Sequence, residues 1–164
     1  MFEIIYKIVC SEYDDFAGEN GFLQIKFNNF QYGEMYPEEL YDIMDKVSLH
    51  DWIERLIRVA KYLRTNDYVA LSDVESYNKW LEFKKKGQNV IVSIVKAKKA
   101  KGSKDVELDL QNSVAGEWTN QVISYDEFQS EIYVKGGEYI RFITENNKES
   151  NIFENLRKEY ENIL

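Results

Sequence analysis

Cysteine and histidine are almost absent from this sequence. Cys10 is the single thiol and His50 the single imidazole among 164 residues. A disulfide within the chain needs two cysteines, and the known zinc and iron–sulfur motifs need several cysteines or histidines at set spacings. These classes of protein are therefore excluded. For Cys10 and His50 we expect a buried thiol and an ordinary surface histidine rather than a catalytic pair, and we expect no metal and no cofactor.

Long apolar runs are missing too. Glu3 and Lys7 interrupt the N-terminal apolar stretch, and no window approaches 18 consecutive apolar residues. We therefore expect neither a signal peptide nor a membrane span. With one thiol and no export signal, the expected location is the cytoplasm. The frequent Asn, Lys, Ile and Tyr residues suggest a low-GC bacterium as the source.

Reaction motifs and linker residues are also scarce. The phosphate-binding motifs Gly-x-x-x-x-Gly-Lys and Gly-x-Gly-x-x-Gly are both absent. The Gly-x-Ser-x-Gly motif, which places a nucleophilic serine, is absent too. One proline and eight glycines argue against a long linker, while 44% hydrophobic and 15% aromatic residues supply a core. The prediction is one domain spanning residues 1–164.

Charge is plentiful but unevenly distributed. The net charge of −8 divides into −7 for residues 1–60, +7 for residues 61–104 and −8 for residues 105–164. An acidic excess disfavours nucleic-acid binding and favours a basic partner. Five lysines fall within residues 96–104. They can grip phosphate, but no aromatic residue is interleaved with them, so we expect a solvated hairpin tip.

Alternating and β-branched segments predict strands. Residues 2–9 are apolar on both faces, which is typical of a central strand, and residues 22–27 alternate cleanly. Gly87 predicts a hairpin turn. The remaining strands are expected at residues 30–35, 68–71, 79–84, 90–97, 105–110 and 122–123.

Apolar residues at helical spacing predict three to four helices. Pro37 begins the first, through residue 47, and Ser48 caps the second, with an apolar stripe from Trp52 to Leu63. Ser124 opens a third, which either ends at Gly136-Gly137 or continues to Thr144. Ser150 caps the last, whose stripe comprises Ile152, Phe153, Leu156, Tyr160, Ile163 and Leu164. The order of elements predicts an α+β fold, with an antiparallel sheet of about six strands packed by these helices.

Binding residues are suggested by acids beside aromatic residues. No carboxylate pair is singled out as catalytic, and the calcium-like run Asp105-x-Glu107-x-Asp109 lacks the required glycine and glutamate. An aromatic cluster rimmed by acids is typical of a hot spot for a basic partner. Burial explains Trp80 equally well. The candidate partner-binding residues are Asp14, Asp15, Asp73, Glu75, Tyr77, Trp80 and Trp118.

Three segments carry a resemblance to a known group of proteins. They are Gly21-Phe-Leu-Gln-Ile-Lys-Phe-Asn-Asn leading into Tyr36-Pro-Glu-Glu-Leu40, Tyr68-Val-Ala-Leu-Ser-Asp73 before a tryptophan hairpin, and Ser124-Tyr-Asp-Glu-Phe128. Taken together, the chain resembles immunity proteins of bacterial polymorphic-toxin and contact-dependent-inhibition systems. The resemblance implies a non-catalytic protein that binds a cognate toxin domain and blocks it. It transfers no binding residues.

Two other functions remain open at this point. One is a small cofactor-independent enzyme using paired carboxylates, which requires a pocket holding two acids of perturbed pKa. The other is a structural or regulatory interaction protein, for which a homodimer through an exposed strand or helix would be the sign.

Overall fold

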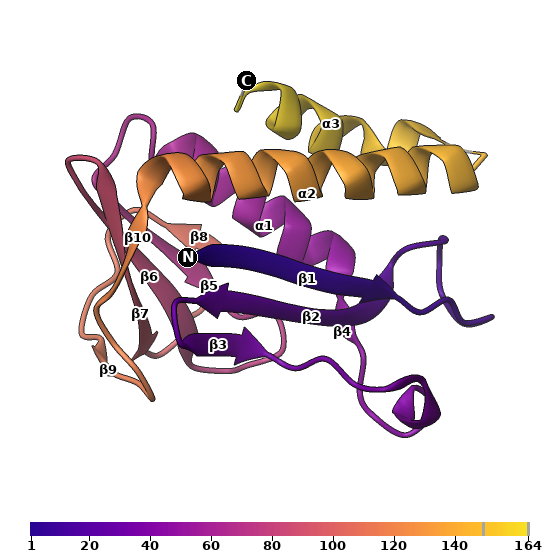
Figure 1. Ribbon diagram of the computed structural model, residues 1–164, viewed down its shortest axis with the longest axis horizontal. Coiled ribbons are helices and arrows are strands. Elements are labelled where there is room, and N and C mark those ends of the chain that lie inside the picture. Colours follow the sequence, from indigo (N-terminus) through magenta and orange to yellow (C-terminus); the bar gives the residue numbers. More distant parts are fainter. Residues whose placement is uncertain (149, 164) are drawn as a thin grey trace.

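The fold combines two antiparallel sheets with helices that cover one side of them. The computed structural model describes residues 1–148 and 150–163, apart from the side chains of Ser150 and Ile152. In Figure 1 the helices lie above the sheets, with α1 innermost. The predicted α+β class is confirmed, although the strands form two sheets rather than one.

The first sheet has the order β1-β2-β3, with β4 also paired to β2. Its strands are β1 (Phe2–Ile8), β2 (Asn20–Phe27), β3 (Phe30–Gly33) and β4 (Val47–Ser48). The alternation predicted for β2 is confirmed, because Leu23, Ile25 and Phe27 are buried. The central position predicted for β1 is wrong, because β1 is an edge strand with α2 (Tyr125–Asn146) packed beside it. The burial predicted for the Cys10 thiol is also wrong, because Cys10 is exposed just after β1.

The second sheet has the order β10-β7-β6-β5-β8, with β9 also paired to β7. Strands β6 and β7 form a long hairpin that turns at Gly87. The φ of Gly87 is +58°, a left-handed conformation that favours glycine. The strand predicted at residues 105–110 shrinks to two residues, and Leu108 is 45% exposed instead of buried. The strands are β5 (Tyr68–Ser72), β6 (Lys79–Lys86), β7 (Asn89–Lys96), β8 (Val106–Glu107), β9 (Val114–Ala115) and β10 (Gln121–Ser124).

Helices α1 (Leu49–Tyr62) and α2 (Tyr125–Asn146) begin at the predicted caps. The Ser48 and Ser124 hydroxyls accept hydrogen bonds from the backbone N–H groups three residues later. Gly136-Gly137 does not end α2. A Cβ at Gly136 would lie 3.2 Å from Ile57 Cδ1, so this glycine lets α2 pass close to α1.

The helix predicted from Pro37 is the main error. Only a 3₁₀ turn, η1 (Glu38–Leu40), forms there, and Val47 belongs to β4. The ring centres of Tyr36 and Tyr41 lie 5.2 and 5.3 Å from the ring centre of Phe22, so both rings pack on Phe22 instead of forming a helical stripe. Because Val47 pairs with Gly21, the chain must be extended where a helix was expected.

The last helix starts later than predicted. A 3₁₀ turn, η2 (Ser150–Phe153), precedes α3 (Glu154–Glu161), and no side chain caps α3. Phe153, Leu156 and Ile163 are buried as predicted. Leu164 and the side chains of Ser150 and Ile152 lie outside the described residues.

Phenylalanine rings from both sheets and α2 form the middle of the core. Phe128 of α2 lies 5.0 Å from Phe2 and 5.4 Å from Phe83, and Phe2 lies 5.4 Å from Phe27. The rings therefore run from the first sheet through α2 to the second. Within the described residues, no helix has the length and apolar content to cross a bilayer.

The β1 edge supports a first prediction. Glu131 on α2 accepts a hydrogen bond from the Ile4 backbone N–H at 3.0 Å. Glu131→Ala leaves this amide unpaired and should lower the unfolding free energy by about 1–3 kcal/mol in urea denaturation. Glu131→Gln retains an acceptor oxygen and should retain most of the stability. Glu138→Ala, at an exposed position of α2, is the control; an equal loss there would contradict the assignment.

Candidate functional site

A cleft opens between the two sheets. One wall is β3 with the residue after it, Gln31 to Glu34, and the cavity measures about 340 Å³. The other wall comes from the second sheet and its loops. It comprises Asp73, Lys79, Ile94, Glu117 and Trp118. Two of the candidate residues, Asp73 and Trp118, therefore line one cavity although 45 positions separate them.

Trp118 forms the back of the cleft and joins the sheets. Its indole N–H donates to the Gln31 carbonyl at 3.1 Å, and its ring lies 5.2 Å from Phe27 and 5.9 Å from Phe30. Only 9% of the residue is exposed. Trp118 is thus mainly a structural residue that presents a small part of its ring to the cleft.

Asp73 is held by donors from two sides. The Tyr32 hydroxyl of β3 donates to Asp73 Oδ2, and the Glu75 backbone N–H donates to Oδ1 at 2.8 Å. Burial, followed by the negative charge of Asp73, raises the pKa of Tyr32 far above its usual value. Tyr32 therefore stays protonated and connects the first sheet to the second.

Glu75 is committed to similar contacts. Its two carboxylate oxygens accept from the Ser48 backbone N–H at 3.1 Å and from the Trp52 indole N–H at 2.8 Å. Burial raises the pKa of Glu75 despite these bonds. Asp73 and Glu75 both line a second cavity of about 160 Å³ behind the cleft. Their contacts make them supports for the start of α1 and for β3.

Glu117 gives the cleft an exposed charge. Its carboxylate lies 2.9 Å from Lys79 Nζ and 3.9 Å from Lys96 Nζ. The hydrogen bond from Lys79 is the main reason that the pKa of Glu117 is lowered. With Glu34 and Asp73, the residues lining the cleft include three carboxylates and one ammonium group, so the cleft is acidic.

A protruding segment that sequence reasoning missed begins at Glu34, in the lining of the cleft. Residues 34–46, which we call the acidic arm, leave β3 and stand out from the body of the molecule (Figure 1). Ile43 is 73% exposed on the arm, and Lys46 is its only basic residue. The exposed acids of the arm are Glu34, Glu38, Glu39, Asp42 and Asp45.

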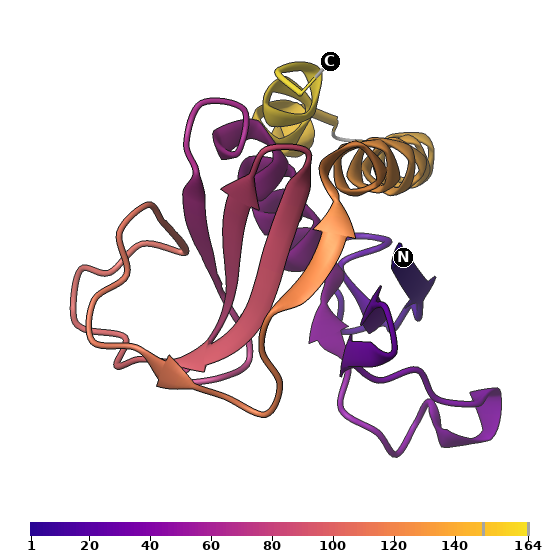
Figure 2. The same ribbon diagram turned by 60° about the vertical axis from the view of Figure 1, so that its left-hand side comes forward.

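The view in Figure 2 shows the same projection from another side, away from the second sheet. Expecting a helix here concealed the arm, because a helix would have packed its apolar residues inward. The signal that was available is the density of acids, five in thirteen residues, around a single proline.

The other candidates lie apart from this cleft. Asp14 accepts from Ser11 N at 2.8 Å and from Asn20 Nδ2 at 2.9 Å, so it shapes the β1–β2 loop, where Asp15 is exposed. Tyr77 is 84% exposed in the turn before β6. Trp80 is 1% exposed and donates to the Ala97 carbonyl at 3.1 Å, which assigns it to the core.

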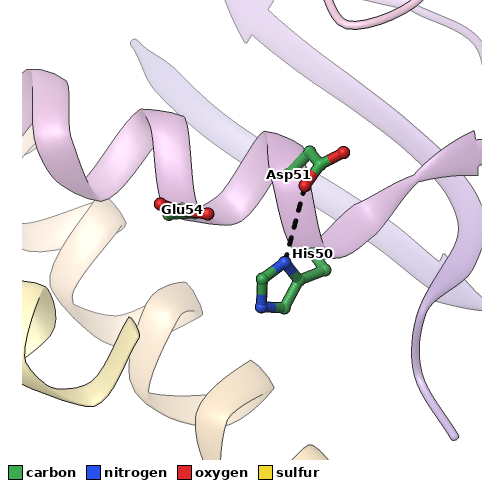
Figure 3. A group of neighbouring side chains, drawn as sticks. All are labelled: His50, Asp51 and Glu54. Atoms are coloured by element: carbon green, nitrogen blue, oxygen red, sulfur yellow. Dashed lines mark ion pairs between the residues drawn. The ribbon is translucent and has the colours of Figure 1, made fainter. Parts of the chain in front are cut away.

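One group of possible metal ligands occurs in the described part of the chain. His50, Asp51 and Glu54 offer ligand atoms within 4.8 Å of one another on the first turns of α1. In Figure 3 the His50 Nδ1 faces Asp51 Oδ1, at 3.6 Å. A cation bound here would face the positive end of the α1 helix dipole, which disfavours metal binding at these three residues. We therefore place the candidate site at the cleft and the arm instead.

Comparison with known proteins adds no relative. No family model, no curated protein and no solved structure matches this chain.

The Tyr32–Asp73 contact supports a second prediction. Tyr32→Phe removes the hydroxyl donor and leaves Asp73 with fewer partners between the sheets, so the unfolding free energy should fall by about 1–3 kcal/mol. Chemical denaturation followed by circular dichroism measures this loss. Tyr13→Phe is the matched control, because Tyr13 is 87% exposed and should tolerate the change. Equal stability of the two variants would show that the contact does not hold the sheets together.

Proposed function

We propose that this chain is a non-catalytic binding protein of the immunity type, which neutralises a basic toxin domain by binding it directly. The observation that carries the proposal is the acidic arm, residues 34–46, which begins at Glu34 in the lining of the acidic cleft and carries five exposed acids and an exposed isoleucine. Opposite charge speeds encounter and orients a basic partner, and buried apolar contact then slows its dissociation.

The arm has the features of a rigid binding element. The rings of Tyr36 and Tyr41 lie on Phe22, which is 1% exposed, and these contacts fix the base of the arm. Ile43, 73% exposed, offers an apolar contact within the arm. A segment already held in place loses less conformational entropy when a partner binds.

A carboxylate enzyme is the weaker alternative. Asp73 and Glu75 do share a cavity, and burial raises the pKa of Glu75, which is one part of what this alternative requires. The cavity of about 160 Å³ is smaller than the roughly 300–1,000 Å³ usual for ligand sites. Both Glu75 oxygens already accept hydrogen bonds from the protein. These contacts favour a structural role for the pair.

The experiment is co-expression with the product of the adjacent reading frame. If that neighbour carries a basic domain that arrests growth when expressed alone, this chain should restore growth. The purified pair should form a stoichiometric complex by calorimetry. Failure to bind or protect against such a domain would overturn the proposal, as would a stable homodimer as the sole complex.

The arm supplies a third prediction. The triple variant Glu38→Gln, Glu39→Gln, Asp42→Asn should weaken binding to the basic partner at least about tenfold, mainly by slowing association, and should reduce the salt dependence of binding. Surface plasmon resonance at several salt concentrations measures both effects. The melting temperature should change little, because these side chains are exposed.

A control variant removes the same charge elsewhere. Glu138→Gln, Glu145→Gln and Glu161→Gln lie at exposed positions of α2 and α3. This variant should bind with nearly unchanged kinetics. If both variants weaken binding equally, net charge rather than the arm is responsible.

A further inference from the structure

A separate hollow, distinct from both cavities described above, is lined in part by Tyr77 and Asn78 at the end of the turn at residues 73–78. Its charge is opposite to that of the cleft. Its volume is about 550 Å³. Three lysines line it, and none of its lining residues is acidic. They are Tyr77, Asn78, Lys96, Ala97, Lys98, Lys99, Asn112 and Val114. In a chain of net charge −8, this hollow concentrates positive charge.

The lysines are not the uniformly solvated tip that was expected. Lys99 Nζ donates to the Asp73 carbonyl at 2.7 Å and to the Ser76 carbonyl, and lies 5.6 Å from the centre of the Trp80 ring. Burial lowers the pKa of Lys99. These bonds hold one wall of the hollow against the turn. The same hydrogen bonds hold the Lys99 ammonium group beside the hollow, and Lys98 takes no part in them.

The remaining polar groups of the hollow are available. Lys98 is exposed, and in the described residues no hydrogen bond or ion pair engages its ammonium group or the side chain of Asn112. Lys96 Nζ lies 3.9 Å from the carboxylate of Glu117, which lines the acidic cleft, so Lys98 is the lysine of the hollow whose ammonium group has no partner among the described residues. Lys96, Lys98 and Asn112 thus line the same hollow.

The aromatic residue that the lysine segment lacks in sequence is supplied by another segment. Tyr77, 84% exposed, comes from the turn before β6 and lines the hollow beside the lysines. Figure 2 shows that the chain between β7 and β9 forms a wide loop beside the second sheet, and residues of this loop line the hollow. An exposed ring next to ammonium groups is the combination that binds a base and its phosphate.

We propose that this hollow binds a nucleotide, with the phosphate between Lys96 and Lys98 and the base stacked on Tyr77. The side-chain amides of Asn78 and Asn112 are placed to hydrogen-bond the sugar or the edge of the base. A volume of about 550 Å³ accommodates one nucleotide. The nucleotide is either a free mononucleotide or one unit of a single strand. This site is separate from the acidic arm and does not depend on the binding of a basic protein.

The test uses the whole chain and defined probes. Adenosine monophosphate, inorganic phosphate, adenosine and a short oligodeoxythymidylate are titrated by calorimetry and by amide chemical shifts. The expected result is saturable binding of adenosine monophosphate, with weaker binding of phosphate and of adenosine alone. Tighter binding of the oligonucleotide assigns the site to single strands, whereas equal or weaker binding assigns it to free nucleotides; both support the site.

Variants locate the binding. Lys98→Ala and Tyr77→Ala should each weaken nucleotide binding about tenfold or more, because each removes one of the two recognition elements. Lys86→Ala and Tyr13→Ala change exposed residues outside the hollow and should have little effect. No saturable binding at millimolar nucleotide, equal binding of inorganic phosphate, or equal loss in Lys86→Ala would overturn the proposal.

Discussion

Among the described residues the two sheets share no hydrogen-bonded strand, so contacts of their side chains join them. Phe128 does so in the core, through contacts with Phe2 of the first sheet and Phe83 of the second. Nearer the surface, Asn28 Nδ2 donates to the Val122 carbonyl at 3.0 Å, and the Trp118 indole donates across the cleft. The cleft exists because these contacts join the sheets along one side and leave a gap beside them.

This division separates the acids of the chain into two kinds. Asp73 and Glu75 lie where the sheets and α1 meet, and their oxygens accept hydrogen bonds from the protein itself. The acids of the arm make few such contacts and remain exposed, so their charge is available to a partner. Composition cannot separate these two uses, since both kinds count equally toward a net charge of −8.

The sequence predicts well the features that depend on near neighbours. The caps at Ser48 and Ser124, the buried stripe of α1 and the turn at Gly87 all lie within a few residues of their partners. The division into two sheets and the failed helix at residues 37–47 depend on distant partners. Tyr36 and Tyr41 pack on Phe22, and no periodicity within residues 37–47 indicates that contact.

The site follows the same rule. Asp73 and Trp118 were singled out and share the cleft, but the pattern that suggested them, acids beside aromatic residues, also describes a buried Trp80 and a structural Glu75. No aromatic residue interrupts the lysine segment, so the sequence by itself favours a solvated tip there. Tyr77 reaches it only through the pairing of β6 with β7, which brings residues 77 and 98 to one hollow.

The hydrogen bond from the Ile4 amide to Glu131 also bears on self-association. An open strand edge is a template for another chain, and acidic side chains or a covering helix are common protections. Here α2 occupies the outer side of β1, so growth of the first sheet is directed to its opposite edge at β3. There the Gln31 carbonyl is already bonded by Trp118, and the acidic arm begins at Glu34. A second copy approaching that edge meets its own negative charge, which opposes growth of this sheet by self-association.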